Sequence, residues 1–204
     1  MNSEFIFRVI FFTVLVLLTV VRVTYGLKAR RTGKGGWAVE EEAIEREGWG
    51  IMLLRIAALP FILAAIVLYG VNPPWLSAFA IPFPAWARWI GVGLAVMSIP
   101  LLVWVHHTLG KHWSTSVQLQ EGHTLVTSGP YRWVRHPIYS SGLLFAVAIW
   151  LVTANGVVGL CWAGTLILYG YRSPREEAML AAEFGEAYRG SAGRTGAVLP
   201  RLWL

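Results

Sequence analysis

The chain lacks aspartate, and cysteine is nearly absent. All 11 acidic residues among its 204 are glutamates, and Cys161 is the one cysteine. A single cysteine excludes a disulfide framework, and its position inside an apolar run predicts a packed thiol rather than a nucleophile. Charge is also scarce, because Asp, Glu, Lys and Arg make up 14% of the chain, whereas a soluble domain carries about 25%.

Apolar sequence takes the place of the missing charge. Hydrophobic residues make up 56% of the chain, and the mean hydropathy is +0.56. This composition predicts an integral membrane protein, and the 11 tryptophans suit its two water–lipid boundaries. The net charge of +6 comes from basic residues that flank apolar runs rather than forming one stripe. We therefore expect contact with membrane lipid and no nucleic-acid partner.

The apolar runs predict an all-α, multi-pass membrane fold with about five transmembrane helices. The expected spans are residues 5–25, 49–70, 86–105, 137–154 and 157–171. The first has the roughly 20 residues that a bilayer requires, and basic residues follow it instead of a signal-peptide cleavage site. The last two are short and are expected to form a packed helical hairpin. Pro174 should break or kink the fifth span where it ends.

The basic residues also predict how the chain is oriented. Most of the 17 lysines and arginines lie in three polar segments, 27–48, 106–136 and 172–204. The positive-inside rule assigns these segments to the cytoplasmic side, with the N-terminus outside and Arg88 at the opposite boundary. We divide the chain into an N-terminal transmembrane part, 1–105, and a C-terminal cofactor-binding and catalytic region, 106–204, on the cytoplasmic side.

All five histidines lie between residues 106 and 136. Histidine clusters can hold transition metals. Here, however, the chain has one His-His pair, no aspartate and no useful cysteine. We therefore expect no metal site, and we expect His106, His107 and His112 to be interfacial.

A polar stretch interrupts the apolar sequence at residues 121–142, EGHTLVTSGPYRWVRHPIYSSG. Proline suits the first position of a helix, so Pro137 predicts a helix start that Arg135 and His136 precede. Such a start attracts carboxylates, and an arginine adds bidentate recognition. The alternative is that Arg132 and Arg135 anchor lipid phosphates. Residue type alone leaves both possibilities open.

A pair of glutamates, Glu176-Glu177, follows the fifth expected span. Adjacent carboxylates can hold a ligand ammonium or act as a base, although a solvated first helical turn has the same composition. The glycines at 33–36 and 91–93 do not follow a strand and open a helix. A nucleotide-binding fold of the Rossmann type is therefore not expected.

Three blocks of sequence resemble the isoprenylcysteine carboxyl methyltransferase and phospholipid methyltransferase superfamily. The first is EGHTLVTSGPY from Glu121 to Tyr131, and the second is RHPIY from Arg135 to Tyr139. The third runs from Arg172 through the Glu176-Glu177 pair to Tyr188, and a closing RTG and LPR follow it. The resemblance covers roughly residues 106–201.

The resemblance implies a helical membrane enzyme that binds S-adenosylmethionine and methylates a lipophilic or prenylated acceptor, with carboxyl methylation of an isoprenylcysteine-like substrate favoured. The implied cofactor-binding residues are His123, Leu125, Arg135, His136, Tyr139, Glu176 and Tyr188. The implied catalytic residues are Arg172 and Glu177. Three alternatives stay open: a phospholipid or lipid amine N-methyltransferase, an NADPH-dependent enzyme like the sterol reductases, and a non-enzymatic membrane protein.

Overall fold

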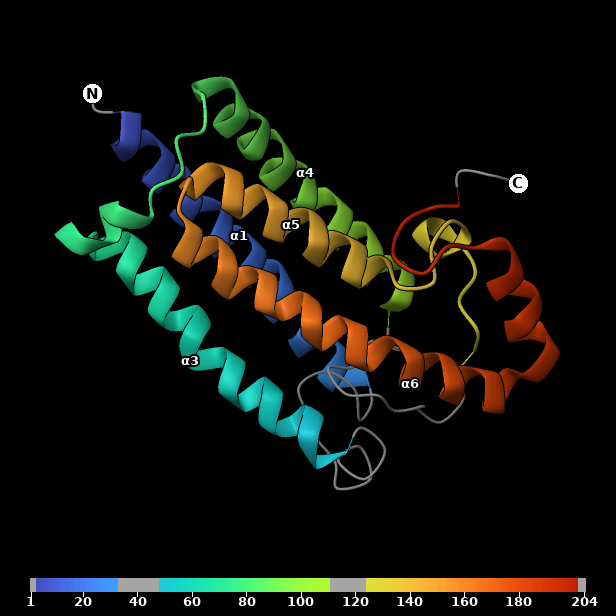
Figure 1. Cartoon of the computed structure of the whole chain (residues 1–204). Coiled ribbons are helices and arrows are strands. Elements are labelled where there is room, and N and C mark those ends of the chain that lie inside the picture. Colours follow the sequence, from blue (N-terminus) through green and yellow to red (C-terminus); the bar gives the residue numbers. More distant parts are fainter. Residues whose placement is uncertain (1–2, 33–47, 111–123, 202–204) are drawn as a thin grey trace.

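The computed structural model describes residues 3–32, 48–110 and 124–201, and the regular elements in these ranges are all helices (Figure 1). The long helices are α1 (Ser3–Thr32), α3 (Trp49–Val71), α4 (Ala85–Leu109), α5 (Pro137–Thr153) and α6 (Gly156–Arg194). Two short 3-10 helices, η1 (Pro74–Phe79) and η3 (Gly129–Arg132), lie in the connections. The prediction of an all-α fold is confirmed.

Within the described ranges, three helices are long and apolar enough to cross a membrane. Their apolar parts are Ser3–Ala29, Met52–Val71 and Ala85–Leu109. The fourth apolar helix, α5, has 17 residues, fewer than the roughly 20 that a perpendicular crossing needs. The chain therefore has the fold of a multi-pass membrane protein, and the count of five spans stays a prediction.

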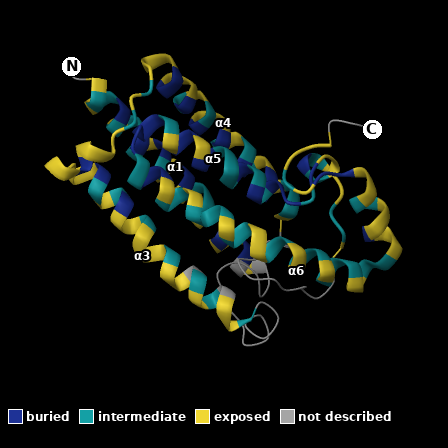
Figure 2. Cartoon of the chain, viewed as in Figure 1, coloured by how far each residue is buried: buried dark blue, intermediate teal, exposed yellow. Residues whose placement is uncertain are grey.

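The outward face of α3 suits contact with lipid. Trp49, Leu53 and Phe61 are exposed by 70%, 61% and 65% (Figure 2). A soluble protein rarely exposes a continuous apolar surface of this kind, and such surfaces mark membrane or partner contacts. The buried side chains gather instead between α1, α4 and α5, where Phe11 and Ile149 are fully buried.

Helices α4 and α5 pack closely because Gly91 has no side chain. A Cβ at this position would lie 2.6 Å from the Leu151 Cβ and 3.0 Å from the Ala148 carbonyl oxygen. Small residues allow helix backbones to approach one another in membranes, where packing contacts and hydrogen bonds drive association. Gly91 therefore sets the distance between the two helices that lead to the polar stretch around His136.

Arg88 joins three helices at one end of the bundle. It is 7% exposed and forms an ion pair with Glu4 on α1. Its Nε and Nη2 atoms donate to the Val152 carbonyl at the end of α5, at 3.1 and 2.9 Å. The start of α1 thus lies beside the end of α5, which fixes the two helices as antiparallel. Arg88, which the sequence placed at the membrane boundary opposite the basic segments, is thus a buried residue that connects three helices.

The prediction of a break at Pro174 is wrong. Helix α6 continues through Pro174, and the non-helical backbone lies at Gly185, with φ 50° and ψ −124°. Glycine adopts a positive φ readily, whereas Pro174 can be carried within a helix whose neighbours satisfy the freed carbonyl. The chain turns at this point, so that the last part of α6 rises toward the segment before α5 (Figure 1).

The expectation of an interfacial histidine is also wrong for His106. Its side chain lies near the end of α4, is 1% exposed, and stacks on Tyr25 with ring centroids 5.1 Å apart. His107 is exposed, in agreement with the expectation. His112 lies outside the described residues.

Candidate functional site

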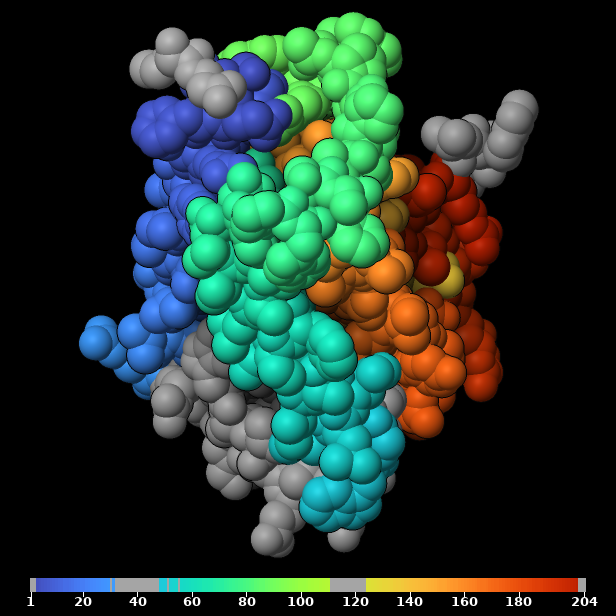
Figure 3. Space-filling view, turned by 60° about the vertical axis from the view of Figure 1, so that its left-hand side comes forward, coloured from blue at the N-terminus to red at the C-terminus, as the bar shows by residue number. Residues whose placement is uncertain are grey.

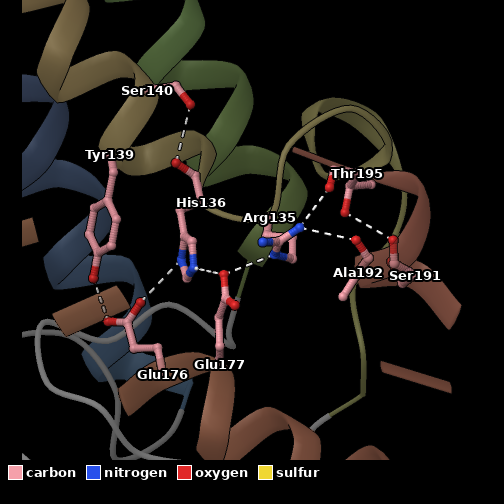
Figure 4. A network of polar contacts seen from close by, with 9 residues as sticks. All are labelled: Arg135, His136, Tyr139, Ser140, Glu176, Glu177, Ser191, Ala192 and Thr195. Carbon is pink, nitrogen blue, oxygen red and sulfur yellow. Dashed lines mark hydrogen bonds and ion pairs between the residues drawn. The ribbon is translucent and has the colours of Figure 1, made fainter. Parts of the chain in front are cut away.

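His136 lies at the centre of a polar cluster at the start of α5. It is the residue before Pro137, the first residue of the helix, and it is 6% exposed. Its Nδ1 atom is 3.4 Å from Glu176 Oε2, and its Nε2 atom is 3.1 Å from Glu177 Oε1 (Figure 4). The imidazole ring thus lies between the two carboxylates, with one ring nitrogen facing each of them.

Glu176 is held from three sides. Tyr139 Oη donates to its Oε1 at 2.6 Å, and Arg172 Nη2 lies 3.1 Å from the same oxygen. Burial opposes the charge on this carboxyl group. The hydrogen bond from His136, the charge of Arg172 and the hydrogen bond from Tyr139 outweigh it, so the pKa of Glu176 lies below its ordinary value. The site therefore contains a half-buried carboxylate that stays ionised.

Glu177 faces the other side of His136 and meets Arg135. The Arg135 Nε donates to Glu177 Oε1 at 2.8 Å. The Arg135 Nη1 donates to the carbonyl oxygens of Ala192 and Thr195, at 3.1 and 2.6 Å. The guanidinium is thus shared between a site carboxylate and the last turn of α6 (Figure 4). Arg135 ties the kinked end of α6 to the start of α5.

The segment after α6 pairs with the residues before α5. Arg135 N donates to Gly196 O at 2.8 Å, His136 N donates to Ala197 O at 2.9 Å, and Gly196 N donates to Trp133 O at 3.1 Å. These bonds bring the closing sequence motif onto the motif around His136. The blocks that lie far apart in the sequence therefore meet through main-chain contacts as well as through side chains.

Aromatic rings extend the cluster into the helix bundle. The Tyr139 ring stacks on His136 at 5.1 Å and on Tyr169 of α6 at 4.4 Å. Gly142 makes room for this stack, because a Cβ there would lie 2.5 Å from the Tyr169 hydroxyl. Sequence reasoning missed Tyr169, since no motif contains it and only the packing of α5 against α6 brings it to the site.

Two further tyrosines lie near the carboxylates. Burial, with the charge of Glu177 as a second cause, raises the pKa of Tyr188 to about 12, and its hydroxyl has no hydrogen-bond partner among the described residues. Burial and then the charge of Glu176 raise the pKa of Tyr131. Tyr131 belongs to the first sequence block but was not predicted as a site residue, because its side chain approaches Glu176 only in the folded chain.

Six of the nine predicted site residues form one connected network. They are Arg135, His136, Tyr139, Arg172, Glu176 and Glu177. Tyr188 is buried beyond the bend at Gly185, within electrostatic reach of both glutamates. Leu125 is half-buried in the segment before η3. His123 lies outside the described residues.

The arrangement suits a small organic cation. Two adjacent carboxylates, both half-buried and one of them held ionised, face a site with aromatic rings and the Tyr188 hydroxyl. Ammonium and sulfonium groups are stabilised by nearby carboxylates and by aromatic faces. In the described residues, no group of three or more His, Cys, Asp or Glu side chains is arranged to hold a metal ion.

Comparison with known proteins gives several matches. Residues 90–182 match the family described as the isoprenylcysteine carboxyl methyltransferase family. The chain is 33% identical over 96 residues to the protein-S-isoprenylcysteine O-methyltransferase of Mus musculus, covering 46% of this chain and 34% of that protein. It is 31% identical over 149 residues to the cobalt-zinc-cadmium resistance protein CzcN of Cupriavidus metallidurans, covering 71% of this chain and 61% of that protein.

A solved structure of a eukaryotic intramembrane Ras methyltransferase, an isoprenylcysteine carboxyl methyltransferase, also matches. The TM-score is 0.49 and the sequence identity 26%, with coverage of 73% of this chain and 51% of that chain. The chain spans 34% of the length of the first curated relatives that it matches.

Proposed function

We propose that this chain, whose residues 90–182 match the isoprenylcysteine carboxyl methyltransferase family, is an S-adenosylmethionine-dependent methyltransferase of the membrane. Its acceptor is a lipophilic carboxylate, of the kind that an isoprenylcysteine presents. One observation carries the proposal: two adjacent carboxylates, Glu176 and Glu177, flank a buried histidine at the start of the apolar helix α5.

The residues present fit S-adenosylmethionine. Glu176 offers a half-buried, ionised carboxylate to an ammonium or sulfonium group. The Tyr188 hydroxyl is a buried polar group without a hydrogen-bond partner among the described residues. We assign Glu176, His136 and Tyr139 to the amino-acid part of the cofactor. When bound, the cofactor supplies the methyl group. The protein contributes alignment and exclusion of water, and alignment alone can supply about 7 kcal/mol in favourable cases.

Arg172 is assigned to the acceptor. Its side chain is 11% exposed and lies beside Glu176, so its charge can orient an acceptor carboxylate toward the cofactor. A carboxylate acceptor needs no base, whereas an amine acceptor must lose a proton. Glu177, the candidate base, is already bound by Arg135 and His136. This occupancy favours carboxyl methylation over lipid amine methylation.

The location of the site is part of the proposal. Following the distribution of basic residues, we assign the site to the cytoplasmic side and the chemistry to residues 106–204, with residues 1–105 completing the membrane part.

Two measurements test the proposal. Isothermal titration of the purified protein with S-adenosylhomocysteine should show saturable binding, and titration with NADPH should show none. His136→Ala and Tyr139→Phe should each weaken that binding without a comparable loss of thermal stability. Radiolabelled methyl transfer, measured in parallel on a prenylcysteine analogue and on a lipid amine, should detect only the former product. NADPH binding, or labelling of the amine alone, would contradict the proposal.

A further inference from the structure

A cavity of about 230 Å³ lies inside the helix bundle, next to the polar cluster. Residues of α1, α3, α4, α5 and α6 line it. Tyr169 belongs both to its wall and to the ring stack on Tyr139. Helix α3 covers the face between α1 and α6 (Figure 3), and its Ile62 forms part of the lining. The cavity is therefore a partly open space between the helices, and it adjoins the proposed methyl-transfer site.

The cavity runs along the helices for about two turns. Helix α1 lines it from Arg22 back to Leu15, and α5 lines it from Ile138 to Phe145. Each stretch advances seven residues, which is about 10 Å at 1.5 Å per residue. Because the start of α1 lies beside the end of α5, through the contacts of Arg88, Arg22 lies at the same end as Ile138. This end is the one nearest His136.

The wall is mostly apolar, although four serine and threonine hydroxyls, the Tyr169 hydroxyl and the Trp162 indole belong to it. The serine and threonine hydroxyls are bonded within their own helices, where each donates to a carbonyl oxygen at a distance of 2.6 to 2.8 Å. They are Thr19, Ser98, Ser141 and Thr165. Such bonds direct the hydroxyl protons away from the cavity and leave methyl and methylene groups as most of its surface. A hydrocarbon chain fits this environment better than a polar group does.

Arg22 contributes the one formal charge to the described lining. It is half-buried, and no carboxylate among the described residues pairs with it. An arginine within a membrane helix is costly, and its guanidinium seeks an anion or a polar surface. The cavity thus has a cationic group at the end near the site and an apolar interior beyond it.

We propose that Arg22 determines which acceptors the site admits, selecting a single-chain lipophilic anion. The hydrocarbon lies in the cavity, the carboxylate lies at the Arg22 end, and Arg172 orients that carboxylate for reaction. The cavity of about 230 Å³ is many times larger than the ~10–15 Å³ that one water molecule needs on the same measure. It can therefore hold a hydrocarbon chain or its first part. The inference rests on the proposed function for the transfer step, whereas the binding step stands by itself.

The test measures binding without the methyl donor, so that it does not depend on activity. The probes are N-acetyl-S-geranylcysteine and its neutral carboxamide, titrated into the purified full chain in detergent micelles. The wild type should bind the carboxylate at least tenfold more tightly than the carboxamide. Arg22→Gln should reduce that preference by weakening carboxylate binding alone, with Arg172 still able to contact the carboxylate, and Arg22→Lys should retain the wild-type preference.

Arg8→Gln is the matched control. Arg8 is also half-buried on α1, but its guanidinium lies over the Tyr69 ring, with a distance of 5.6 Å to the ring centroid, and it does not line the cavity. This variant should keep the wild-type preference. Equal loss of both probes in Arg22→Gln, or an unchanged preference, would overturn the proposal.

A second pair of variants tests the position of the chain. Ser98 is 1% exposed and lines the cavity, so Ser98→Leu should fill part of it and weaken both probes, whereas Ser98→Ala should not. Unchanged binding in a folded Ser98→Leu protein would mean that the chain lies elsewhere. If the protein transfers methyl groups but the probes do not bind as expected, the proposed function stands and the cavity assignment is wrong. If the probes bind as expected but no methyl transfer occurs, the cavity assignment stands and the proposed function is wrong.

Discussion

Arg172 and Glu177 are the two residues whose side chains have the most specific expected effects on the reaction. Arg172→Ala and Glu177→Gln should each lower methyl transfer at least tenfold, which corresponds to about 1.4 kcal/mol in the barrier. Arg172→Ala removes the cation that orients the acceptor, so it should spare S-adenosylhomocysteine binding more than His136→Ala does. The measurement is radiolabelled transfer to a prenylcysteine analogue.

Arg175→Ala is the control for this pair of variants. Arg175 is exposed, and its Nη1 donates to the Tyr171 carbonyl of its own helix at 2.9 Å. Its replacement should leave the transfer rate near the wild-type value. If both site variants transferred methyl groups at the wild-type rate, Arg172 and Glu177 would be ordinary charges at the membrane boundary with no role in the reaction.

The lowered pKa of Glu176 predicts how the stability of the fold depends on pH. Its pKa is lower in the folded protein than the ordinary carboxyl value, so its ionisation stabilises the fold above that ordinary value, about 4.3, and this contribution disappears as the pH falls through the lowered pKa. The melting temperature of the wild type should therefore drop more steeply than that of Glu176→Gln between about pH 5 and pH 3. Parallel melting curves for the two proteins would disprove the linkage.

Single residues also show how far sequence reasoning reaches. The motif around His136 and the glutamate pair could be found because resemblance fixes their order along the chain, and the structure brings them together. Tyr169 and the partners of Arg88 could not be found in this way. Their contacts join residues on different helices, and the sequence pattern of one helix does not determine which side chain of another will face it.

The elements follow their local signals except where tertiary packing overrides them. Pro137 begins α5 as its fixed φ predicts. Pro174 does not end α6, although proline usually breaks a helix in water. The bend at Gly185 carried a signal in the sequence, since glycine permits a positive φ. The helix could have continued through that glycine equally well, so the bend could be located only in the folded chain.

The bend at Gly185 leads to a prediction about stability and cofactor binding. Gly185→Ala forces a side chain into φ 50° and ψ −124°, a backbone conformation that residues other than glycine rarely adopt, at a cost on the order of 1 to 3 kcal/mol. It should lower the melting temperature and also weaken cofactor binding, because Tyr188 lies one turn beyond the bend. Gly190→Ala is the matched control, since this glycine is helical with no heavy atom within 4 Å of an added Cβ. It should be neutral or stabilising by about 0.4 to 1 kcal/mol.

The whole molecule has two ends, and the described polar segments share one of them. The segment before α5 and the bent end of α6 meet at the site, whereas η1 and the loop between α5 and α6 meet at the other end through the Asn155 bond to the Leu76 carbonyl, at 3.1 Å. The grouping of the segments could be predicted from the basic residues. The absolute orientation stays a prediction, because it depends on the membrane as well as on the fold.

Cysteine labelling tests that orientation. Cys161 is first replaced by alanine, and single cysteines are introduced at Ser77 and at Arg189, which are both exposed. An impermeant maleimide added outside intact cells should label the cysteine at position 77 and should reach the one at position 189 only after the cells are opened. Labelling of both positions from outside would refute the arrangement with the N-terminus outside.

The main-chain pairing of Gly196 and Ala197 with Arg135 and His136 has a consequence for biosynthesis. These contacts join residues about 60 positions apart, so the site cannot take its final form until residue 197 has left the ribosome. The membrane helices are synthesised earlier, and chains fold largely in the order of their synthesis. A nascent chain stalled within α6 would therefore be inserted yet unable to bind its cofactor. Ligand binding can then report completed synthesis in a way that insertion cannot.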